Sequence, residues 1–244
     1  MKEDEIREKF MRVLEDCRKK DGTVDLNQAY SSIGLWMRHF LSPADQKRME
    51  YIVDWCDGVS KILDIGCGDG MLAKRLSEKG SEVVGVDISI DQLKEGKRNS
   101  KSLNFVRGDA THPVFRRGSF DVVVAGEVLE HLRRPFESLL EWRHLLKPNG
   151  RLILSTPNNV NLAKICRHLM GRKPPIRDLH LNFYDFYTIQ QILNFAGYEI
   201  ELARTIRLPF PYLRYRLFLI QLSLAGLFPA IGDPILLRCT VSGA

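Results

Sequence analysis

The sequence predicts an α/β fold, in which helices cover both faces of a doubly wound, mostly parallel sheet. From Lys61 onward, apolar runs of strand length alternate with runs of helix length, which is the order of successive strand–helix–strand units. Several of the strand-like runs end in a glycine or an acidic residue. The 244 residues are 44% hydrophobic and 27% charged, so the chain can build the core that such a sheet requires.

The individual strands and helices are predicted from where the apolar runs start and stop. The first strand, Lys61 to Ile65, leads through a glycine turn into a helix from Met71 to Lys79, which Gly80 ends. Ser89 is the predicted N-cap of the next helix. The other predicted helices are Ile90–Arg98, Pro135–Leu146 and Tyr187–Phe195. The other predicted strands are Glu82–Val86, Leu103–Val106, Phe120–Ala125, Arg151–Ser155 after a turn at Lys147–Gly150, one strand after Gly197, and Ile235–Thr240.

Helices are also predicted ahead of the first strand. They are Glu3–Lys19, Ala29–Phe40, and a helix that Ser42 caps, that Pro43 opens and that ends near Gly58. We therefore predict two parts, a helical cap at residues 1–58 and a main domain at 59–244. The main domain carries basic or apolar additions at about 159–185 and 204–232. The cap either covers a ligand or simply packs on the domain, and the sequence favours neither alternative.

The glycine turn after the first strand has the pattern Asp64-x-Gly66-x-Gly68-x-Gly70. A strand, a glycine turn and a helix start together present free backbone N–H groups, which suits a nucleotide-like ligand. The dinucleotide pattern Gly-x-Gly-x-x-Gly fails here, because Met71 stands at its third glycine position. The turn instead resembles the first motif of class I S-adenosylmethionine-dependent methyltransferases. That resemblance implies a Rossmann-like, seven-stranded fold, S-adenosyl-L-methionine as cofactor, and cofactor contacts from Asp64, Gly66, Cys67, Gly68 and Gly70.

Acidic residues follow the next two predicted strands. Asp87 ends the second strand, where a carboxylate can accept hydrogen bonds from both hydroxyls of a ribose. Asp109 follows the third strand, and in the resembling family an acid at this turn contacts the adenine amino group. We predict cofactor contacts from Asp87 with its neighbour Ile88, and from Asp109 with its neighbour Ala110. A plain turn role for Asp109 is the alternative.

After the fourth strand, the stretch from Glu127 to His131 reads Glu-Val-Leu-Glu-His. It resembles the Glu-x-x-Glu-His stretch of quinone-biosynthesis O-methyltransferases, where it is linked to a divalent cation that holds a phenolate. We predict that Glu127 contacts the cofactor and that His131 is the catalytic residue. Two alternatives stay open: Glu127, Glu130 and His131 bind a cation, or His131 only caps a helix.

Several classes of methyltransferase are disfavoured. The chain lacks the Asp/Asn-Pro-Pro-aromatic turn of amino-directed nucleic-acid enzymes and has Ala125-Gly126-Glu127 in its place. It has no cysteine in the region where cytosine C5 enzymes place their nucleophile, and no recognisable RNA-binding module. Its five cysteines are scattered without Cys-x-x-Cys spacing, which argues against zinc and favours a reducing cytoplasm. The charged start, Met1 to Lys20, is unlike a signal peptide.

The expected function is therefore methyl transfer from S-adenosylmethionine to a small molecule, with O-methylation of a quinone-like or lipid-linked acceptor favoured. C- or N-methylation of another metabolite is one alternative, and a cofactor-binding accessory protein without turnover is another. Residues 151–244 hold 11 Lys and Arg against 5 Asp and Glu, so an acidic partner is sought there. For residues 204–232 a packed helix, an acceptor wall and a peripheral membrane contact all remain open. The sequence does not indicate an oligomeric state.

Overall fold

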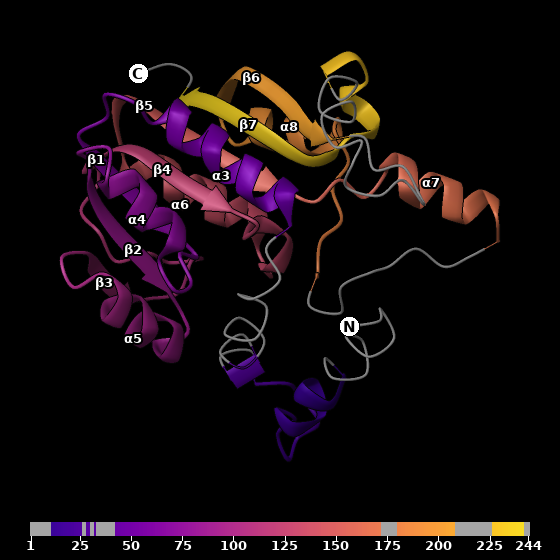
Figure 1. The fold of residues 1–244 in the computed structure, drawn as a ribbon, viewed down its shortest axis with the longest axis horizontal. Coiled ribbons are helices and arrows are strands. Elements are labelled where there is room, and N and C mark those ends of the chain that lie inside the picture. The colour runs from indigo at the N-terminus through magenta and orange to yellow at the C-terminus, as the bar shows by residue number, and fades with distance from the viewer. Residues whose placement is uncertain are drawn as a thin grey trace.

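The computed structural model describes residues 11–25, 28–29, 32, 42–171, 180–207 and 226–241. This part of the chain contains a seven-stranded sheet with the order β3-β2-β1-β4-β5-β7-β6 (Figure 1). Only β7 runs antiparallel to its neighbours; the other pairings, from β3 to β5, are parallel. The predicted Rossmann-like, doubly wound fold is therefore confirmed.

The strands are β1 (Lys61–Ile65), β2 (Glu82–Asp87), β3 (Asn104–Arg107), β4 (Phe120–Gly126), β5 (Leu146–Thr156), β6 (Tyr198–Arg207) and β7 (Asp233–Val241). The helices are α3 (Pro43–Trp55), α4 (Met71–Ser77), α5 (Ile90–Asn99), α6 (Pro135–Leu145), α7 (Leu162–Leu169) and α8 (Thr188–Phe195). Two single turns of 3₁₀ helix are η2 (Leu129–His131) and η4 (Pro229–Ile231). Each strand predicted from Lys61 onward is present, within a few residues of its expected bounds.

The helix starts follow the capping signals in the sequence. The Ser42 side chain accepts from the Asp45 backbone N–H while the Asp45 carboxylate accepts from the Ser42 backbone N–H, a reciprocal capping box. Ser89 caps α5 by accepting a hydrogen bond from the Gln92 backbone N–H at 3.3 Å. Gly80 has φ +94°, a left-handed conformation that suits a residue just after a helix.

The structure differs from the sequence-based prediction in the bounds of two elements. The predicted turn at Lys147–Gly150 lies inside β5, where the register with β4 jumps: Phe120 pairs with Leu146, but Val122 pairs with Arg151. The turn residues therefore form an irregularity within a longer strand. In the N-terminal part, helical residues end at 16 rather than at Lys19, because Arg18 forms a β-bridge with Val24 around a turn. Residues 1–10 and most of Ala29–Phe40 lie outside the described part.

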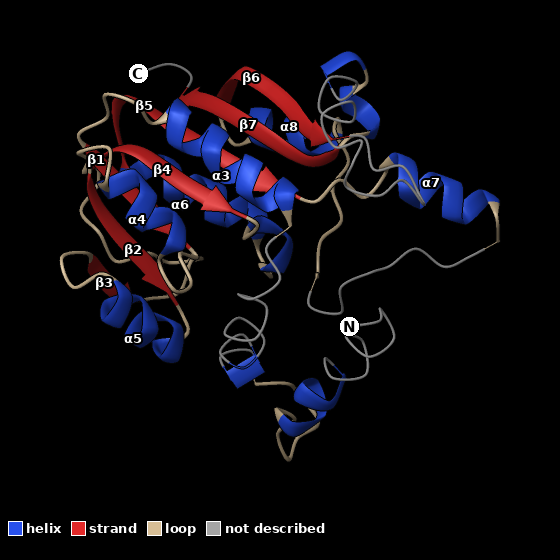
Figure 2. Ribbon diagram, viewed as in Figure 1, coloured by secondary structure: helices blue, strands red, loops and turns tan. Residues whose placement is uncertain are grey.

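Helices cover both faces of the sheet (Figure 2), and the core is divided between these faces. On one face, α3 and α4 bury Ile52, Val53 and Leu76 against strands β1, β2 and β4. On the other face, α6 and α8 bury residues that include Trp142 and Ile189. Since α3 packs in the same cluster as β1, this helix belongs to the core of the sheet domain. The division into residues 1–58 and 59–244 otherwise stays a prediction. Within the described ranges no helix has the length and apolar character needed to cross a bilayer.

Candidate active site

A cavity of about 590 Å³ opens at the carboxyl ends of β1, β2 and β4. Parallel α/β sheets bind their ligands at this edge, because the glycine turns and helix starts meet there. The lining includes most of the cofactor residues predicted from the sequence, together with the predicted catalytic residue: Gly66, Gly68, Asp87, Ile88, Asp109, Ala110, Glu127 and His131. The structure thus brings together residues from four separate stretches of the chain.

The glycine turn approaches the cavity in a conformation that side chains rarely adopt. Gly66, Gly68 and Gly70 have φ values of +68°, +55° and +75°. A Cβ at Gly66 would collide with the Val128 side chain, and a Cβ at Gly70 would lie 2.5 Å from the ring of Phe105. The backbone at Gly66 and Gly68 forms part of the cavity wall, so a ligand can lie directly on it. This cradle fits the methionine part of S-adenosylmethionine.

Asp87 joins the second strand to the glycine turn. One carboxylate oxygen accepts from the Gly68 backbone N–H at 2.9 Å, and the other accepts from the Ser89 backbone N–H at 2.8 Å. Burial raises the pKa of Asp87, while these backbone hydrogen bonds oppose that effect. Asp87 lines the cavity, and each carboxylate oxygen has a second lone pair that could accept from a ribose hydroxyl.

Three predicted cofactor residues, Asp64, Cys67 and Gly70, do not line the cavity. Asp64 is 2% exposed, and burial followed by the charge of Asp87 raises its pKa to about 7. A backbone hydrogen bond from Ala73 links its carboxylate to the first turn of α4. Cys67 is buried beneath the turn, and burial raises the pKa of its thiol, so it remains a neutral packing group. These residues support the turn from below.

The adenine end of the predicted site is formed by the turn after β3. The Asp109 carboxylate is exposed and accepts from the Thr111 backbone N–H at 2.8 Å. The backbone carbonyl of Ala110 accepts from the Trp142 indole N–H at 2.7 Å, which ties the turn to α6. Asp109 therefore acts as a turn residue here and still lies on the cavity wall, so both alternatives drawn from the sequence remain compatible.

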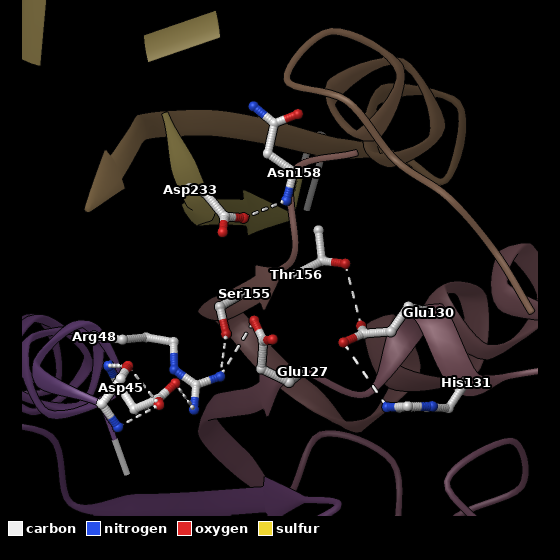
Figure 3. Close-up of polar contacts among 10 residues, drawn as sticks. Asp45, Arg48, Glu127, Glu130, His131, Ser155, Thr156, Asn158 and Asp233 are labelled. Carbon is white, nitrogen blue, oxygen red and sulfur yellow. Dashed lines mark hydrogen bonds and ion pairs between the residues drawn. The ribbon is translucent and has the colours of Figure 1, made fainter. Parts of the chain in front are cut away.

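Glu127 lies directly after β4 with φ +60°, a rare conformation for a residue other than glycine. Its backbone N–H donates to the Ser155 carbonyl at 2.9 Å. Its carboxylate faces Arg48 of α3, with Nη1 of the guanidinium 3.2 Å from Oε1 (Figure 3). Nη1 also lies 3.3 Å from the Ser155 hydroxyl, and Nη2 lies 3.8 Å from the Asp45 carboxylate. Arg48 thus connects the helix before the sheet to the ends of β4 and β5.

Glu130, His131 and His180 form a polar cluster beside the cavity. Glu130 is 1% exposed; its Oε2 accepts from the Thr156 hydroxyl at 3.1 Å, and its Oε1 lies 3.9 Å from His131 Nε2 (Figure 3). The rings of His131 and His180 meet edge to face, with centroids 4.8 Å apart. Burial, with the charge of Glu127 added, raises the pKa of Glu130 well above its usual range.

Among the described residues, this cluster has the side-chain composition and the spacing that a cation site requires. One ligand atom from each of Glu130, His131 and His180 lies within 4.8 Å of the others. The alternative set drawn from the sequence is thereby corrected, because His180 takes the place of Glu127, whose carboxylate faces Arg48. Two imidazoles and one carboxylate suit a transition metal better than magnesium, which prefers oxygen ligands.

A second cavity, of about 420 Å³, lies on the other side of Glu127. Its walls come from the start of α3, the segment after β5, helix α7, the stretch after residue 180, and the facing ends of β6 and β7. Glu127 lines both cavities, so the two spaces meet at its side chain. The residues that line the second cavity include Asp45, Glu127, Glu130, Asn159, Lys164, Arg167, His180, Asn182, Phe183, Arg207 and Asp233.

Sequence reasoning missed Arg48 and His180 as site residues, and also Gln92, Thr111 and His112 on the wall of the first cavity. Of these residues, only Gln92 could have been placed near the site from the sequence. It lies in the first turn of a helix whose start was predicted from Ser89. The other missed residues reach the site only through tertiary packing.

Comparison with known proteins identifies the domain. Residues 63–154 match a family model described as a methyltransferase domain. The ubiquinone biosynthesis O-methyltransferase of Vibrio campbellii is 31% identical over 137 residues, which are 53% of this chain and 58% of that protein. The mitochondrial ubiquinone biosynthesis O-methyltransferase of Schizosaccharomyces pombe is 35% identical over 117 residues, 45% of this chain and 42% of that protein. The chain spans about half the length of these curated relatives.

A solved structure extends the fold comparison over more of the chain. The magnesium protoporphyrin IX methyltransferase of Synechocystis, solved with bound S-adenosylhomocysteine, superposes with a TM-score of 0.65. The match covers 89% of this chain and 98% of that one at 18% sequence identity, so it shows the shared fold. Together with the cavity geometry, these findings confirm the predicted family and its cofactor, S-adenosyl-L-methionine. Residues 63–154 of this chain therefore form a methyltransferase domain, within a fold shared with S-adenosylmethionine-dependent methyltransferases.

Proposed function

We propose that the protein transfers the methyl group of S-adenosylmethionine to a hydroxyl of a small quinone-like or lipid-linked acceptor. The observation that carries the proposal is the pair of cavities that meet at Glu127, one on the glycine turn and the other lined by polar side chains. Gly66, Gly68 and Asp87 would hold the cofactor, with Asp109 and Ala110 at its adenine end. The cofactor supplies a methyl group that is already activated on a sulfonium, so alignment and exclusion of water are the main tasks of the protein.

The choice of a hydroxyl acceptor is supported by the curated relatives, whose names describe O-methylation in ubiquinone biosynthesis. Oxygen acceptors must lose a proton, and His131 lies where it could take it. The His131 side chain lines the first cavity, and its Nε2 lies 3.9 Å from the buried carboxyl of Glu130. In this proposal His131 receives the acceptor proton, and the nearby carboxyl of Glu130, which the Thr156 hydroxyl holds in place, stabilises the protonated ring.

The proposal is tested with isotopically methyl-labelled S-adenosylmethionine and matched acceptors. The acceptors are a catechol, an aniline in which an amino group replaces a hydroxyl of that catechol, and a polyprenylated catechol. We expect label on the catechols, and we expect His131→Ala to lower turnover more than it lowers cofactor affinity. Label on the aniline alone would favour the N-methylation alternative. Cofactor binding without label on any acceptor would favour the accessory-protein alternative.

The peripheral membrane contact proposed for 204–232 depends mostly on residues 208–225, which lie outside the described part. Its support is the sequence alone: Arg204, Arg207, Arg214 and Arg216 without an acid between Ala203 and Gly232. Each arginine near an anionic surface contributes about 1 kcal/mol. Sedimentation with anionic and neutral vesicles at low and high salt tests the contact. Binding to neither vesicle type would leave a packed helix or an acceptor wall, and normal acceptor kinetics in the arginine variants would then favour the packed helix. The cytoplasmic location remains a proposal of the same kind.

A further inference from the structure

Residues 180–184, which we call the strap, link the segment after β5 to the turn after β4. Tyr184 forms a parallel bridge with Asn158, and the Asn159 backbone N–H donates to the Tyr184 carbonyl at 2.7 Å. From this anchor the strap reaches η2, the single turn of 3₁₀ helix that carries His131. The strap therefore joins two strand ends that meet at the candidate active site.

The anchored end of the strap is fixed by hydrogen bonds and packing. Asn158 is fully buried, and its side-chain amide donates to the Ala230 and Gly232 carbonyls at 2.9 and 2.7 Å. Its backbone N–H donates to the Asp233 carboxylate at 2.9 Å (Figure 3). The Tyr184 side chain is buried in the core of the sheet domain. The strap is thus held at the junction between the end of β5 and the start of β7.

At its other end the strap supplies hydrogen-bond donors to η2. The backbone N–H groups of Leu181 and Asn182 both donate to the Glu130 carbonyl, at 2.8 and 3.0 Å. The Asn182 side-chain amide donates to the Leu132 carbonyl at 2.6 Å and to the Leu129 carbonyl at 3.4 Å. Asn182 therefore bonds, through its backbone and its side chain, to three of the carbonyls of this turn.

The turn depends on such outside partners. Within it, the His131 backbone N–H donates to the Val128 carbonyl at 3.0 Å, and the Leu132 backbone N–H donates to the Leu129 carbonyl at 3.3 Å. A single 3₁₀ turn has little stability of its own, because its hydrogen bonds are few and their geometry is poor. The orientation of η2 is therefore set largely by the groups that hold its carbonyls.

Asn182 holds this turn from behind the wall of the cofactor cavity. Val128, His131 and Leu132 line that cavity, whereas Asn182 lines only the second one. The strap also meets the His131 side chain, because the rings of His180 and His131 lie edge to face with centroids 4.8 Å apart. His131 is thus held by the strap both at its backbone and at its ring.

From these contacts we propose that Asn182 is a positioning residue for methyl transfer, which places the His131 imidazole on the wall of the cofactor cavity by holding the carbonyls of η2. The inference rests on the proposed function, in which His131 receives the acceptor proton. Proton transfer requires hydrogen-bond distance between the two partners, so a small displacement of the turn lowers the rate. Asn182 acts through His131, since its amide already donates to two carbonyls and does not line the cofactor cavity.

The first test is Asn182→Leu, which keeps the approximate size of the side chain and removes its donors. We expect kcat to fall about tenfold or more, as a part of the about 10²–10⁴-fold that a positioned general base contributes. The acceptor KM and the affinity for S-adenosylhomocysteine should stay close to the wild-type values. A raised acceptor KM with unchanged kcat would mean direct contact with the acceptor, and equal losses of kcat and cofactor affinity would mean a general structural role. Either result would overturn the proposal.

Two further variants support this comparison. Asn194→Leu makes the same change at an exposed position of α8 and should behave like the wild type. Asn182→Ser keeps one hydrogen-bond donor and should give a smaller loss of kcat than Asn182→Leu. If unfolding curves show that Asn182→Leu does not fold, Asn182→Ser takes its place in every measurement.

A double variant tests whether Asn182 acts through His131. Effects of residues that act as a unit are not additive. We therefore expect Asn182→Leu to lower kcat in the wild-type protein and to cause no further loss in His131→Ala. Additive losses in the double variant would contradict the proposal.

The final test needs no turnover, so it separates this inference from the proposed function. It compares the imidazole NMR signals of His131, assigned by their loss in His131→Ala, with S-adenosylhomocysteine bound. These signals should move in Asn182→Leu and stay in place in Asn194→Leu; unmoved signals in Asn182→Leu would overturn the positioning role. Moved signals in a protein that methylates no acceptor would remove the proposed function and leave the positioning of His131 standing. Methyl transfer that falls in His131→Ala but not in Asn182→Leu would do the reverse.

Discussion

The guanidinium of Arg48, on the helix before the first strand, lies 3.2 Å from the carboxylate of Glu127, at the point where the two cavities meet. The side chains are only 14% and 24% exposed, so this ion pair is partly shielded from water. Loss of one partner from a shielded pair leaves the other charge uncompensated, which costs more than a surface pair contributes. Helix α3 is thereby fixed to the strand ends that form the site.

Arg48→Met is expected to destabilise the protein by about 1–3 kcal/mol, because Glu127 and Asp45 lose a common partner. Lys47→Met is the matched control: it removes the neighbouring cation, whose pair with Glu50 is at the surface and contributes at most about 1 kcal/mol. Urea unfolding at constant pH measures both. Adding Glu127→Gln to Arg48→Met should recover part of the loss, as a coupled pair requires. Indistinguishable losses for the two single variants would contradict the role given to Arg48.

Asp87→Ala is expected to weaken S-adenosylhomocysteine binding by about 1–3 kcal/mol, since it removes hydrogen-bond acceptors for the ligand and the tie to the Gly68 backbone. Calorimetric titration measures the loss. Asp91→Ala, an exposed acid in the first turn of the following helix, serves as the control and should bind like the wild type. Unchanged affinity in Asp87→Ala would remove Asp87 from the cofactor site.

Asp64 gives a prediction about pH. Its folded pKa of about 7 lies above the value of 3.8 for an ordinary aspartate, so the folded state holds a proton that the unfolded state releases. The contribution of Asp64 to stability is therefore greatest below about pH 4 and falls as pH rises toward 7. Asp64→Asn, which cannot ionise and can still accept from Ala73, should flatten this part of the profile. Urea midpoints from pH 4 to 8 measure it, with the exposed Asp57→Asn as control. If the stability of Asp64→Asn falls with pH as steeply as that of the wild type, the role given to Asp64 is wrong.

We expect methyl transfer to survive excess chelator, because the proposed chemistry uses His131 as a base and because the Glu130 carboxyl is already bonded to the Thr156 hydroxyl. The measurement is turnover before and after incubation with chelator, followed by addition of magnesium, manganese or zinc. Loss of activity that one of these ions restores, and that His180→Ala makes permanent, would instead assign a cation to Glu130, His131 and His180.

The parts of this structure that local signals specify could be predicted from the sequence. Strand β1 could be predicted from the apolar run before Gly66, and the starts of α3 and α5 could be predicted from the capping residues Ser42 and Ser89. Each of these signals involves only residues close together in the sequence. The edge of the sheet that carries the site could be predicted because the carboxyl ends of parallel strands lie at the same edge. The turn at Lys147–Gly150 was misplaced because pairing with β4 continues through it, and no local signal reports a partner strand.

Arg48 and His180 could not be predicted for the same physical reason. Arg48 reaches Ser155 across 107 residues of sequence, and His180 meets His131 only because the segment around Leu181 and Asn182 hydrogen-bonds to the Glu130 carbonyl. Such contacts are set by how α3 and the segment after residue 180 pack on the sheet. Packing between distant segments produces no regular spacing of residues in the sequence, so these contacts could not be predicted from it.

The measurement that tests the central claim most directly is binding of S-adenosylmethionine to the glycine-turn cavity, compared between the wild type, Gly68→Val and Gly118→Val. Gly68 lines the cavity at φ +55°, whereas Gly118 has a similar φ of +62° with open space around it, so the two variants share the backbone strain and differ in location. Calorimetric titration, with unfolding curves to confirm that each variant folds, should give micromolar affinity for the wild type and Gly118→Val and no binding for Gly68→Val. Binding by folded Gly68→Val at wild-type affinity, or no binding by the wild type, would contradict the account.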